Sequence, residues 1–370
     1  MIRILHLSDF HYKDNHDADF QVAAGKISDA IKDKHIDLVL FSGDLVYDTK
    51  QSNKINKAAS CLFDPIKTAT GLNNDRIFIT AGNHDMKRDA ELSMVKKAFS
   101  TFTSYTDVNE FAEDKEQLKL SLENFKSYNE FVSTFYGDTI DVQPLYLCHN
   151  VVIDGCKIGF LSFNSAWRCT KSENDRGKLV YPVYMVSEAF EKVKDCDFII
   201  CTQHHNLSDY TDSVGREIED LINEKCHILF TGHYHHASVR TSHDSEIGLL
   251  HLIAPATYNR DDKNSHYGFS IVEIDTTTYE GMLYQYSLHE GSFKQIAEKP
   301  ISVPVSDEKA ELNIFRKLLR KRYNQILEKA DALFVSGKEG AFLSLFKQPI
   351  IKNKSVQEII TTRKEGDIII

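Results

Sequence analysis

The sequence predicts an α/β fold, and two observations lead to this prediction. Apolar runs of strand length, rich in β-branched and aromatic residues and ending near Gly, Asn or Asp, recur along the first two-thirds of the chain. Between the first three of these runs, apolar residues repeat at helical spacing instead. Alternation of strand, helix and strand indicates parallel crossover units, in which functional groups gather outside the carboxyl ends of the strands.

Five of the strand-like runs each precede a short cluster of residues that can bind metal. The runs are 2–8, 38–42, 76–81, 198–202 and 227–231. The clusters that follow them are Asp9-Phe10-His11, Gly43-Asp44, Gly82-Asn83-His84-Asp85, His204-His205 and Gly232-His233-Tyr234-His235. Because functional groups meet at one edge of such a sheet, we expect the five clusters to form a single site.

Two helices are predicted between the first three strands. The apolar positions that indicate them are Phe20, Ala23, Ile27, Ala30 and Ile31, then Ile55, Ala58, Ala59, Leu62, Phe63 and Ile66. Each set recurs at a period of three to four residues, which is the spacing of one buried helix face.

The residue types of the clusters favour two divalent metal ions. Asp, Asn and His without Cys supply oxygen and imidazole donors, which suit Mn, Fe, Zn or Ni. Together they exceed the four ligands of a tetrahedral zinc. Paired ions, roughly 3.5–4 Å apart, polarise phosphoryl oxygens and lower the pKa of a bridging water. Asp44, at a strand end behind the turn at Gly43, is the expected bridging carboxylate.

The ordered clusters resemble the calcineurin-like metallophosphoesterases, whose pattern is D-x-H, G-D, G-N-H-D/E, a lone H, then G-H-x-H. All five elements occur here in order, and the resemblance covers residues 1–290 approximately. It implies a four-layer αββα sandwich of two mixed sheets flanked by helices. We expect the later hairpin-like runs, 249–253, 268–274 and 281–286, to complete the second sheet.

The resemblance also implies a role for each site residue. Asp9, His11, Asp44 and His235 would hold the first ion, and Asp44, Asn83, His204 and His233 the second. His84 would face the substrate phosphate and stabilise or protonate the leaving oxygen, while Asp85 would orient His84. His205 stays open as the alternative to His204, because Asn206 replaces the Pro that many relatives place after this pair, which leaves the loop less rigid.

The composition predicts a cytoplasmic enzyme without membrane contact. The chain has 370 residues, 42% apolar and 26% charged, which is enough for one large domain and an appendage. No stretch approaches the roughly 20 apolar residues of a membrane helix, and the first strand begins too early for a signal peptide. The seven Cys are scattered, which is typical of reduced thiols.

We expect a phosphoesterase domain over residues 1–300 and a helical C-terminal appendage or linker over 301–370. A polar insertion over about 86–144 has helical periodicity, with apolar positions from Leu118 to Phe135. Because it starts beside His84, it either shapes substrate entry or serves as a scaffold. In the appendage, a long amphipathic helix is expected over 307–335.

The appendage also suggests a further module in the same polypeptide. A basic cluster at 316–322 either follows nucleic-acid phosphates or forms a solvated helix face. The apolar run at 364–370 reads as the start of a buried strand, and the segment before it resembles the linker into the ATPase of STAND-type signalling proteins. We therefore expect an ATPase module as a partner, with this chain as the effector of an antiviral defence protein.

Three functions remain open from the sequence. The first is a phosphodiesterase acting on nucleic acid, a nuclease, with Mn as the expected metal. The second is a phosphodiesterase for cyclic or small nucleotides. The third, a non-catalytic binding scaffold, is disfavoured because a scaffold has no physical reason to gather buried charges and imidazoles. The net charge of -10 argues against a large nonspecific nucleic-acid footprint.

Overall fold

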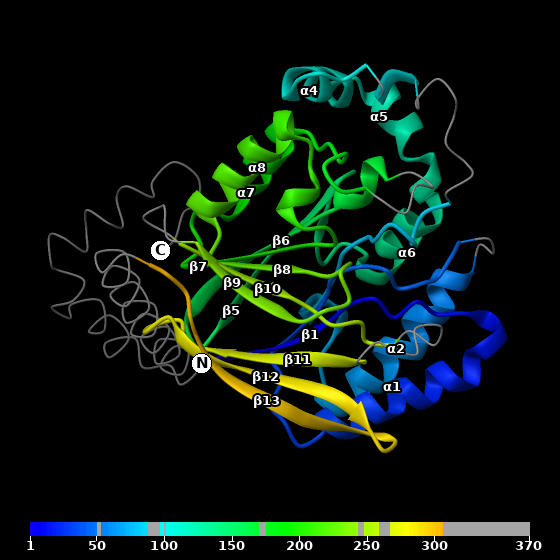
Figure 1. Cartoon of the computed structure of the whole chain (residues 1–370), viewed down its shortest axis with the longest axis vertical. Helices are drawn as coiled ribbons and strands as arrows, with labels where there is room; N and C mark the ends of the chain where they lie inside the picture. Colours follow the sequence, from blue (N-terminus) through cyan, green and yellow to red (C-terminus); the bar gives the residue numbers. More distant parts are fainter. Residues whose placement is uncertain are drawn as a thin grey trace, which may run out of the picture. The chain divides into compact units, whose positions relative to one another are not determined.

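Two mixed β-sheets and their flanking helices form the computed structural model (Figure 1). The structure describes residues 1–49, 53–87, 97–99, 101–169, 175–242, 248–258 and 267–305. All of them belong to one compact unit, Met1–Ala310. The amphipathic helix predicted over 307–335, the basic cluster and the apolar run at 364–370 lie outside the described residues.

The first sheet combines strands from both ends of this unit. β1 (Ile2–Leu7), β2 (Leu38–Phe41) and β3 (Ile77–Ile79) run parallel, and β11 (Gly268–Ile274), β12 (Glu280–His289) and β13 (Ser292–Ser302) continue the sheet antiparallel. The strand order is β13-β12-β11-β1-β2-β3. Every side chain of β2 and β3 is buried, which is why these strands are continuous apolar runs in the sequence.

The second sheet has the order β4-β5-β6-β7-β8-β10-β9. Its strands are β4 (Asp141–Val142), β5 (Tyr146–Ile153), β6 (Cys156–Phe163), β7 (Phe198–Gln203), β8 (Ile228–Thr231), β9 (Ser238–Ser242) and β10 (Leu249–Ile253). The prediction that all three late hairpin-like runs join this sheet is wrong for two of them. β10 does so, but β11 pairs with β1, where Ile2 lies opposite Ile274, and β12 follows β11.

The two sheets pack face to face between two layers of helices, as predicted. Phe78 of β3 stacks on Phe160 of β6 with ring centroids 4.1 Å apart. The helices α1 (Asp17–Ile31) and α2 (Lys54–Thr70) cover the first sheet, and α7 (Val183–Val193) and α8 (Asp212–Lys225) cover the second (Figure 1). Phe41–Phe63 and Phe163–Phe190 ring contacts join the respective sheets to α2 and α7.

The predicted insertion is helical, and its last helix covers the edge of the first sheet at β3. It contains α4 (Tyr105–Glu113), α5 (Lys115–Ser121), the short η3 (Glu123–Phe125) and α6 (Lys126–Tyr136). The hydroxyl of Tyr136 accepts the N–H of Ile79 at 3.0 Å and donates to the carbonyl of Ile77 at 2.8 Å. These bonds satisfy backbone groups on edge strand β3, so α6 serves as a scaffold.

In the described ranges, further short helices connect these elements: η1 (Asp14–His16), η2 (Asn74–Arg76), η4 (Ser165–Arg168) and η5 (Leu207–Asp209). The seven cysteines lie in the described ranges and form no disulfide, and all but Cys61 are buried. Within the described ranges, no helix is both long enough and apolar enough to cross a bilayer.

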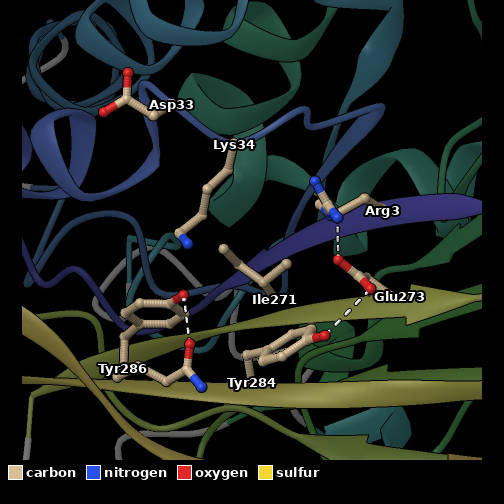
Figure 2. Close-up of a pocket in the computed structure, with 8 residues that line it drawn as sticks. Arg3, Asp33, Lys34, Ile271, Glu273, Tyr284 and Tyr286 are labelled. Atoms are coloured by element: carbon tan, nitrogen blue, oxygen red, sulfur yellow. Dashed lines mark hydrogen bonds and ion pairs between the residues drawn. The ribbon is translucent and has the colours of Figure 1, made fainter.

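A cavity of about 280 Å³ opens on the first sheet, lined by Arg3, Lys34 and Tyr286 among others (Figure 2). Arg3 forms an ion pair with Glu273 there. Arg3 is near the start of β1, whereas Asp9 follows its end, so roughly 20 Å of extended strand separates this cavity from the predicted site.

Candidate metal centre

The five clusters meet where the carboxyl ends of β1, β2 and β3 face those of β7 and β8. We had expected the five strands to belong to one sheet, but β1, β2 and β3 belong to the first sheet and β7 and β8 to the second. Side chains cross between the sheets at this point. Nδ1 of His204 lies 2.7 Å from the carbonyl oxygen of Ser42, and the backbone N–H of His233 donates to Oδ2 of Asp9 at 3.1 Å.

Five of the predicted ligands have a left-handed backbone conformation. They are Asp9, His11, Asp44, His233 and His235, with φ of 54°, 49°, 60°, 69° and 59°. This conformation is uncommon for residues other than Gly and costs roughly 1–3 kcal/mol where the surroundings impose it. Strained residues cluster at functional sites, so the repetition of this conformation at five predicted ligands indicates a functional site here.

One group of donor atoms consists of Asp9, His11 and His235. Nε2 of His235 lies 3.1 Å from Oδ1 of Asp9 and 3.3 Å from Nε2 of His11. One ligand atom from each residue falls within 4.8 Å of the others. These are three of the four residues predicted to hold the first ion.

A second group surrounds His204. Its Nδ1 faces the carbonyl oxygen of Ser42, which can only accept, so Nδ1 carries the proton in the neutral ring. Its Nε2 faces Oδ1 of Asn83 at 3.1 Å and Oδ2 of Asp44 at 3.4 Å, and it carries the lone pair when the ring is neutral. Asn83 Oδ1 and Asp44 Oδ2 only accept, so a positive centre between them and His204 fits this arrangement, either a proton on Nε2 or a divalent ion in its place.

Asp44 lies between the two groups. Its Oδ2 is 3.4 Å from Nε2 of His204 and 3.8 Å from Nε2 of His11. Its Oδ1 accepts the backbone N–H of His84 at 2.8 Å. The carboxylate predicted to bridge two ions therefore contacts donors of both groups.

Opposite charges stabilise each other in this buried cluster. Burial opposes ionisation of Asp44, but the surrounding imidazoles, His204 first among them, hold its pKa well below the usual range. Burial likewise opposes ionisation of Asp9, but the hydrogen bond from His235 and nearby charges lower its pKa to about 2. Burial lowers the pKa of His204, yet Asp44 outweighs it and raises that pKa to about 9. The carboxylates thus favour positive charge between them, which divalent ions would supply.

The fourth predicted ligand of the second ion, His233, lies beside this group. Its ring centroid is 5.1 Å from that of His204. Ligand atoms of His204, His205 and His233 fall within 4.8 Å of one another. The geometry thus brings together all seven residues predicted as metal ligands.

His84 is a partly buried member of the cluster. Its Nδ1 lies 2.7 Å from the carbonyl oxygen of Tyr47, which fixes the ring and makes Nδ1 the proton donor. Nε2 is then left to accept or donate a proton towards a substrate. The Tyr47 side chain is 42% exposed, and its ring centroid lies 5.4 Å from that of His84.

Asp85 has a different position from the one predicted. The orientation of His84 comes from Tyr47, while the Asp85 carboxylate accepts the backbone N–H groups of Gly82 at 2.9 Å, Asp44 at 3.0 Å and Val46 at 3.0 Å. Asp85 therefore fixes the loop backbone that carries the ligands. Burial, with the adjacent Asp44 charge, raises its pKa to about 7.

His205 faces away from Asp44 and Asn83. Its Nδ1 lies 3.0 Å from Oγ of Ser165 and its Nε2 lies 3.5 Å from Sγ of Cys169. Burial lowers the pKa of His205 well below its usual value. The geometry favours His204 at the position between Asp44 and Asn83.

The loop after β7 is held firmly although it lacks Pro. The side chains of Asn206 and Asp209 form a capping box around η5, and Thr231 donates to Oδ1 of Asn206 at 3.2 Å. The side-chain amide of Gln203 donates to the carbonyl of His205 at 2.7 Å. We had expected this loop to be less rigid without Pro, but these hydrogen bonds hold it in place.

Glycines allow the close approach of the loops. A Cβ atom on Gly82 would overlap Oδ1 and the backbone nitrogen of Asp44, and one on Gly43 would stand 2.5 Å from Nδ1 of His204. A Cβ on Gly232 would overlap Oγ of Ser8. Each Gly of the sequence pattern therefore has a steric reason.

Sequence reasoning missed Tyr47, Lys13 and Ser42. Tyr47 and Ser42 act through carbonyl oxygens, which every residue type has, so their identity carries no signal. The Lys13 ammonium lies 3.8 Å from the ring centroid of Tyr47, a cation–π contact that depends on the fold.

Comparisons with known proteins agree with this geometry. A family model described as calcineurin-like phosphoesterase matches residues 2–237. A curated protein of Bacillus subtilis (strain 168), described as the uncharacterized metallophosphoesterase-like protein YydB, is 22% identical in an alignment of 270 residues, and the match covers 69% of this chain and 53% of that protein. The chain thus spans about half the length of this relative.

Among solved structures, the calcineurin-like phosphoesterase YfkN from Bacillus subtilis is 14% identical, with a TM-score of 0.39, and the match covers 87% of this chain and 98% of that chain. Vps29 from Chaetomium thermophilum is 13% identical, with a TM-score of 0.33, and the match covers 83% and 97%. Neither likeness carries a functional inference at these values. The family match covers more than half of the chain and includes every motif, and the chain therefore belongs to the calcineurin-like phosphoesterase family, whose members hydrolyse phosphoesters with divalent metals.

Proposed function

We propose that this protein is a phosphodiesterase that cleaves nucleic acid with two divalent ions. The observation that carries the proposal is the position of Asp44 between two groups of donors, with His84 beside it. Asp9, His11, Asp44 and His235 would hold one ion, and Asp44, Asn83, His204 and His233 the other. When bound, the ions would activate water for attack on phosphorus and offset the charge on the phosphoryl oxygens.

His84 would handle the proton of the leaving group. Tyr47 holds Nδ1, so Nε2 can donate a proton to the leaving oxygen when the ring is charged, and stabilise negative charge there by the same hydrogen bond. Asp85 would act as a positioning residue, because it binds the backbone of Asp44 and Gly82.

The rim of the site supports a nucleic-acid substrate. Tyr47 presents a partly exposed ring beside His84, and Lys13 places a positive charge over that ring. Exposed aromatic rings and cations bind single-stranded nucleic acids by stacking and by charge. A cyclic or small nucleotide would use the same two features, so it stays the second candidate.

A regulated effector role remains part of the proposal. It rests on the sequence of 301–370, where a STAND-type ATPase module of a defence protein would follow. A gene whose reading frame stops after Ile370 would remove this part and leave the phosphodiesterase proposal intact.

Hydrolysis of linear duplex and single-stranded DNA and of RNA by the purified chain with Mn²⁺, beside the His84→Ala variant, tests the substrate. Cleavage by the wild type, with a large loss in the variant, is the expected result. Turnover of cyclic or small nucleotides without polymer cleavage would favour the second candidate. A protein that binds metal but cleaves none of these substrates would favour a scaffold.

The metal is tested by reconstitution. Metal-free protein is loaded with Mn²⁺, Fe²⁺, Zn²⁺ or Ni²⁺, and turnover is compared at equal occupancy. We propose Mn²⁺ as the most active ion, and a higher rate with any other ion would contradict this.

A further inference from the structure

Another group of ligand-type side chains lies beside the dinuclear centre, and we propose that Cys169, Asp175 and His205 bind a third ion, a zinc. Each residue offers one ligand atom, and the three atoms lie within 4.8 Å of one another. All three residues are buried. The assignment does not depend on the substrate proposed above.

The distance between two of the donors matches a zinc site. Sγ of Cys169 lies 3.5 Å from Nε2 of His205. In a tetrahedral site with Zn–S of about 2.3 Å and Zn–N of about 2.1 Å, sulfur and nitrogen stand about 3.6 Å apart. Little movement of either side chain is then needed to admit the ion.

The His205 ring is oriented for this role by contacts at its far side. Oγ of Ser165 lies 3.0 Å from Nδ1 and also accepts the backbone N–H of His205 at 3.1 Å. Metal-binding histidines usually have such a partner on the second ring nitrogen, which fixes the tautomer and the ring orientation. With Nδ1 held by Ser165, Nε2 is the nitrogen that meets Cys169.

The donor types select zinc. A thiolate, an imidazole and a carboxylate together suit a borderline-soft ion that accepts tetrahedral geometry. Binding would release the proton of the Cys169 thiol to solvent, because the thiolate is the ligand form. Water or one more donor would complete the fourth position.

Such an ion would connect the insertion, η4 and the loop after β7, which carries His204. Cys169 directly follows η4, and His205 directly follows His204. In η4, Nε1 of Trp167 donates to Oγ of Ser121 in α5 at 2.8 Å, and its ring meets that of Phe99 with centroids 5.2 Å apart. The zinc would tie the insertion and η4 to the loop that presents His204 to the dinuclear centre.

The test must separate this site from the dinuclear centre, because ligand atoms of His205 also lie near those of His204 and His233. Cobalt does so: a thiolate bound to Co²⁺ gives a near-ultraviolet charge-transfer band, and the seven ligands of the dinuclear centre include no sulfur. Full-length protein loaded with Co²⁺ should show this band. The Cys169→Ser variant should lose it, while Cys61→Ser and Asp44→Asn should keep it.

Zinc content gives a second readout. The wild type should bind about three zinc ions per chain and Cys169→Ser about two. Cobalt-loaded wild type without a thiolate band would overturn the proposal, and this measurement needs no variant to fold. A band that persists in Cys169→Ser, or equal zinc content in both proteins, would overturn it as well.

Discussion

At the scale of single residues, this site consists of side chains whose backbone is strained to present them. Asp44 has φ of 60°, and its nitrogen is held by Asp85. Asn tolerates this conformation at least as well as Asp. Substitution of Asp44 by Asn therefore removes the charge between the two groups without adding backbone strain, which makes it an informative variant.

His84 and Asp44 should have separable effects. His84→Ala should keep its metal content and lose roughly 10²-fold or more in turnover, because it removes proton transfer alone. Asp44→Asn should lose both metal and activity, because the shared carboxylate is gone. Metal analysis and steady-state rates of the two variants check this. Equal loss of metal in both would refute the division of roles.

Gly82→Ala should disrupt the site although it alters no ligand. Its Cβ would overlap Oδ1 and the backbone nitrogen of Asp44, so the carboxylate must move. Gly25→Ala is the matched control, because nothing lies within 4 Å of its Cβ in α1. The control should gain up to about 1 kcal/mol from helix propensity and keep full metal content. Calorimetric titration with Mn²⁺ distinguishes the two, and similar affinities would contradict the steric argument.

At the scale of elements, the sequence predicts features that depend on neighbouring residues, but not contacts between residues far apart along the chain. The strands and ligand clusters were predictable because each strand ends at its own Gly, Asp or His. The helix faces of α1 and α2 followed from periodicity. The pairing of β11 with β1 joins Ile274 to Ile2, and no local pattern specifies a partner so far along the chain. The Tyr47 contact to His84 was missed for the same reason.

The insertion should stabilise the sheet edge through Tyr136. Tyr136→Phe removes an acceptor for the N–H of Ile79 and a donor to Ile77, which should cost about 1–3 kcal/mol of unfolding free energy. Tyr105→Phe is the control, because Tyr105 is 41% exposed on α4, and its effect should stay within about 0.5 kcal/mol. Urea unfolding checks both. Equal urea midpoints for the wild type and Tyr136→Phe would show that these two bonds do not stabilise the sheet edge.

At the scale of the whole molecule, the site joins the two sheets. Asp9, His11, Asp44 and Asn83 come from the first sheet, and His204, His233 and His235 follow strands of the second. Ions bound between them should therefore stabilise the packing of one sheet on the other. Metal at about 1,000 times its dissociation constant should add about 4 kcal/mol. Thermal unfolding with and without chelator measures this, and Asp44→Asn should show little response.

Metal-free protein should lose stability in acid because several buried histidines, among them His6 and His251, resist protonation in the folded state. Burial lowers the pKa of His6 to about 3 and that of His251 to about 4, from an unfolded value of 6.5. Below pH 6.5 the unfolded chain binds protons that the folded chain does not, so the free energy of unfolding falls as pH falls towards 4. Each histidine contributes a slope of up to about 1.4 kcal/mol per pH unit.

His251→Gln isolates one of these contributions. Gln can keep a hydrogen bond to Thr231, which His251 contacts at 2.9 Å, but it does not titrate. The variant will be less stable than the wild type at pH 7, and this deficit should shrink by about 2 kcal/mol at pH 5, because the wild type alone pays the cost of excluding a proton. Urea unfolding in chelator at both pH values measures the difference, with His289→Gln as the surface control. A deficit for His251→Gln that is constant between the two pH values would show that His251 is protonated in the folded state, and that its burial is not a source of acid sensitivity.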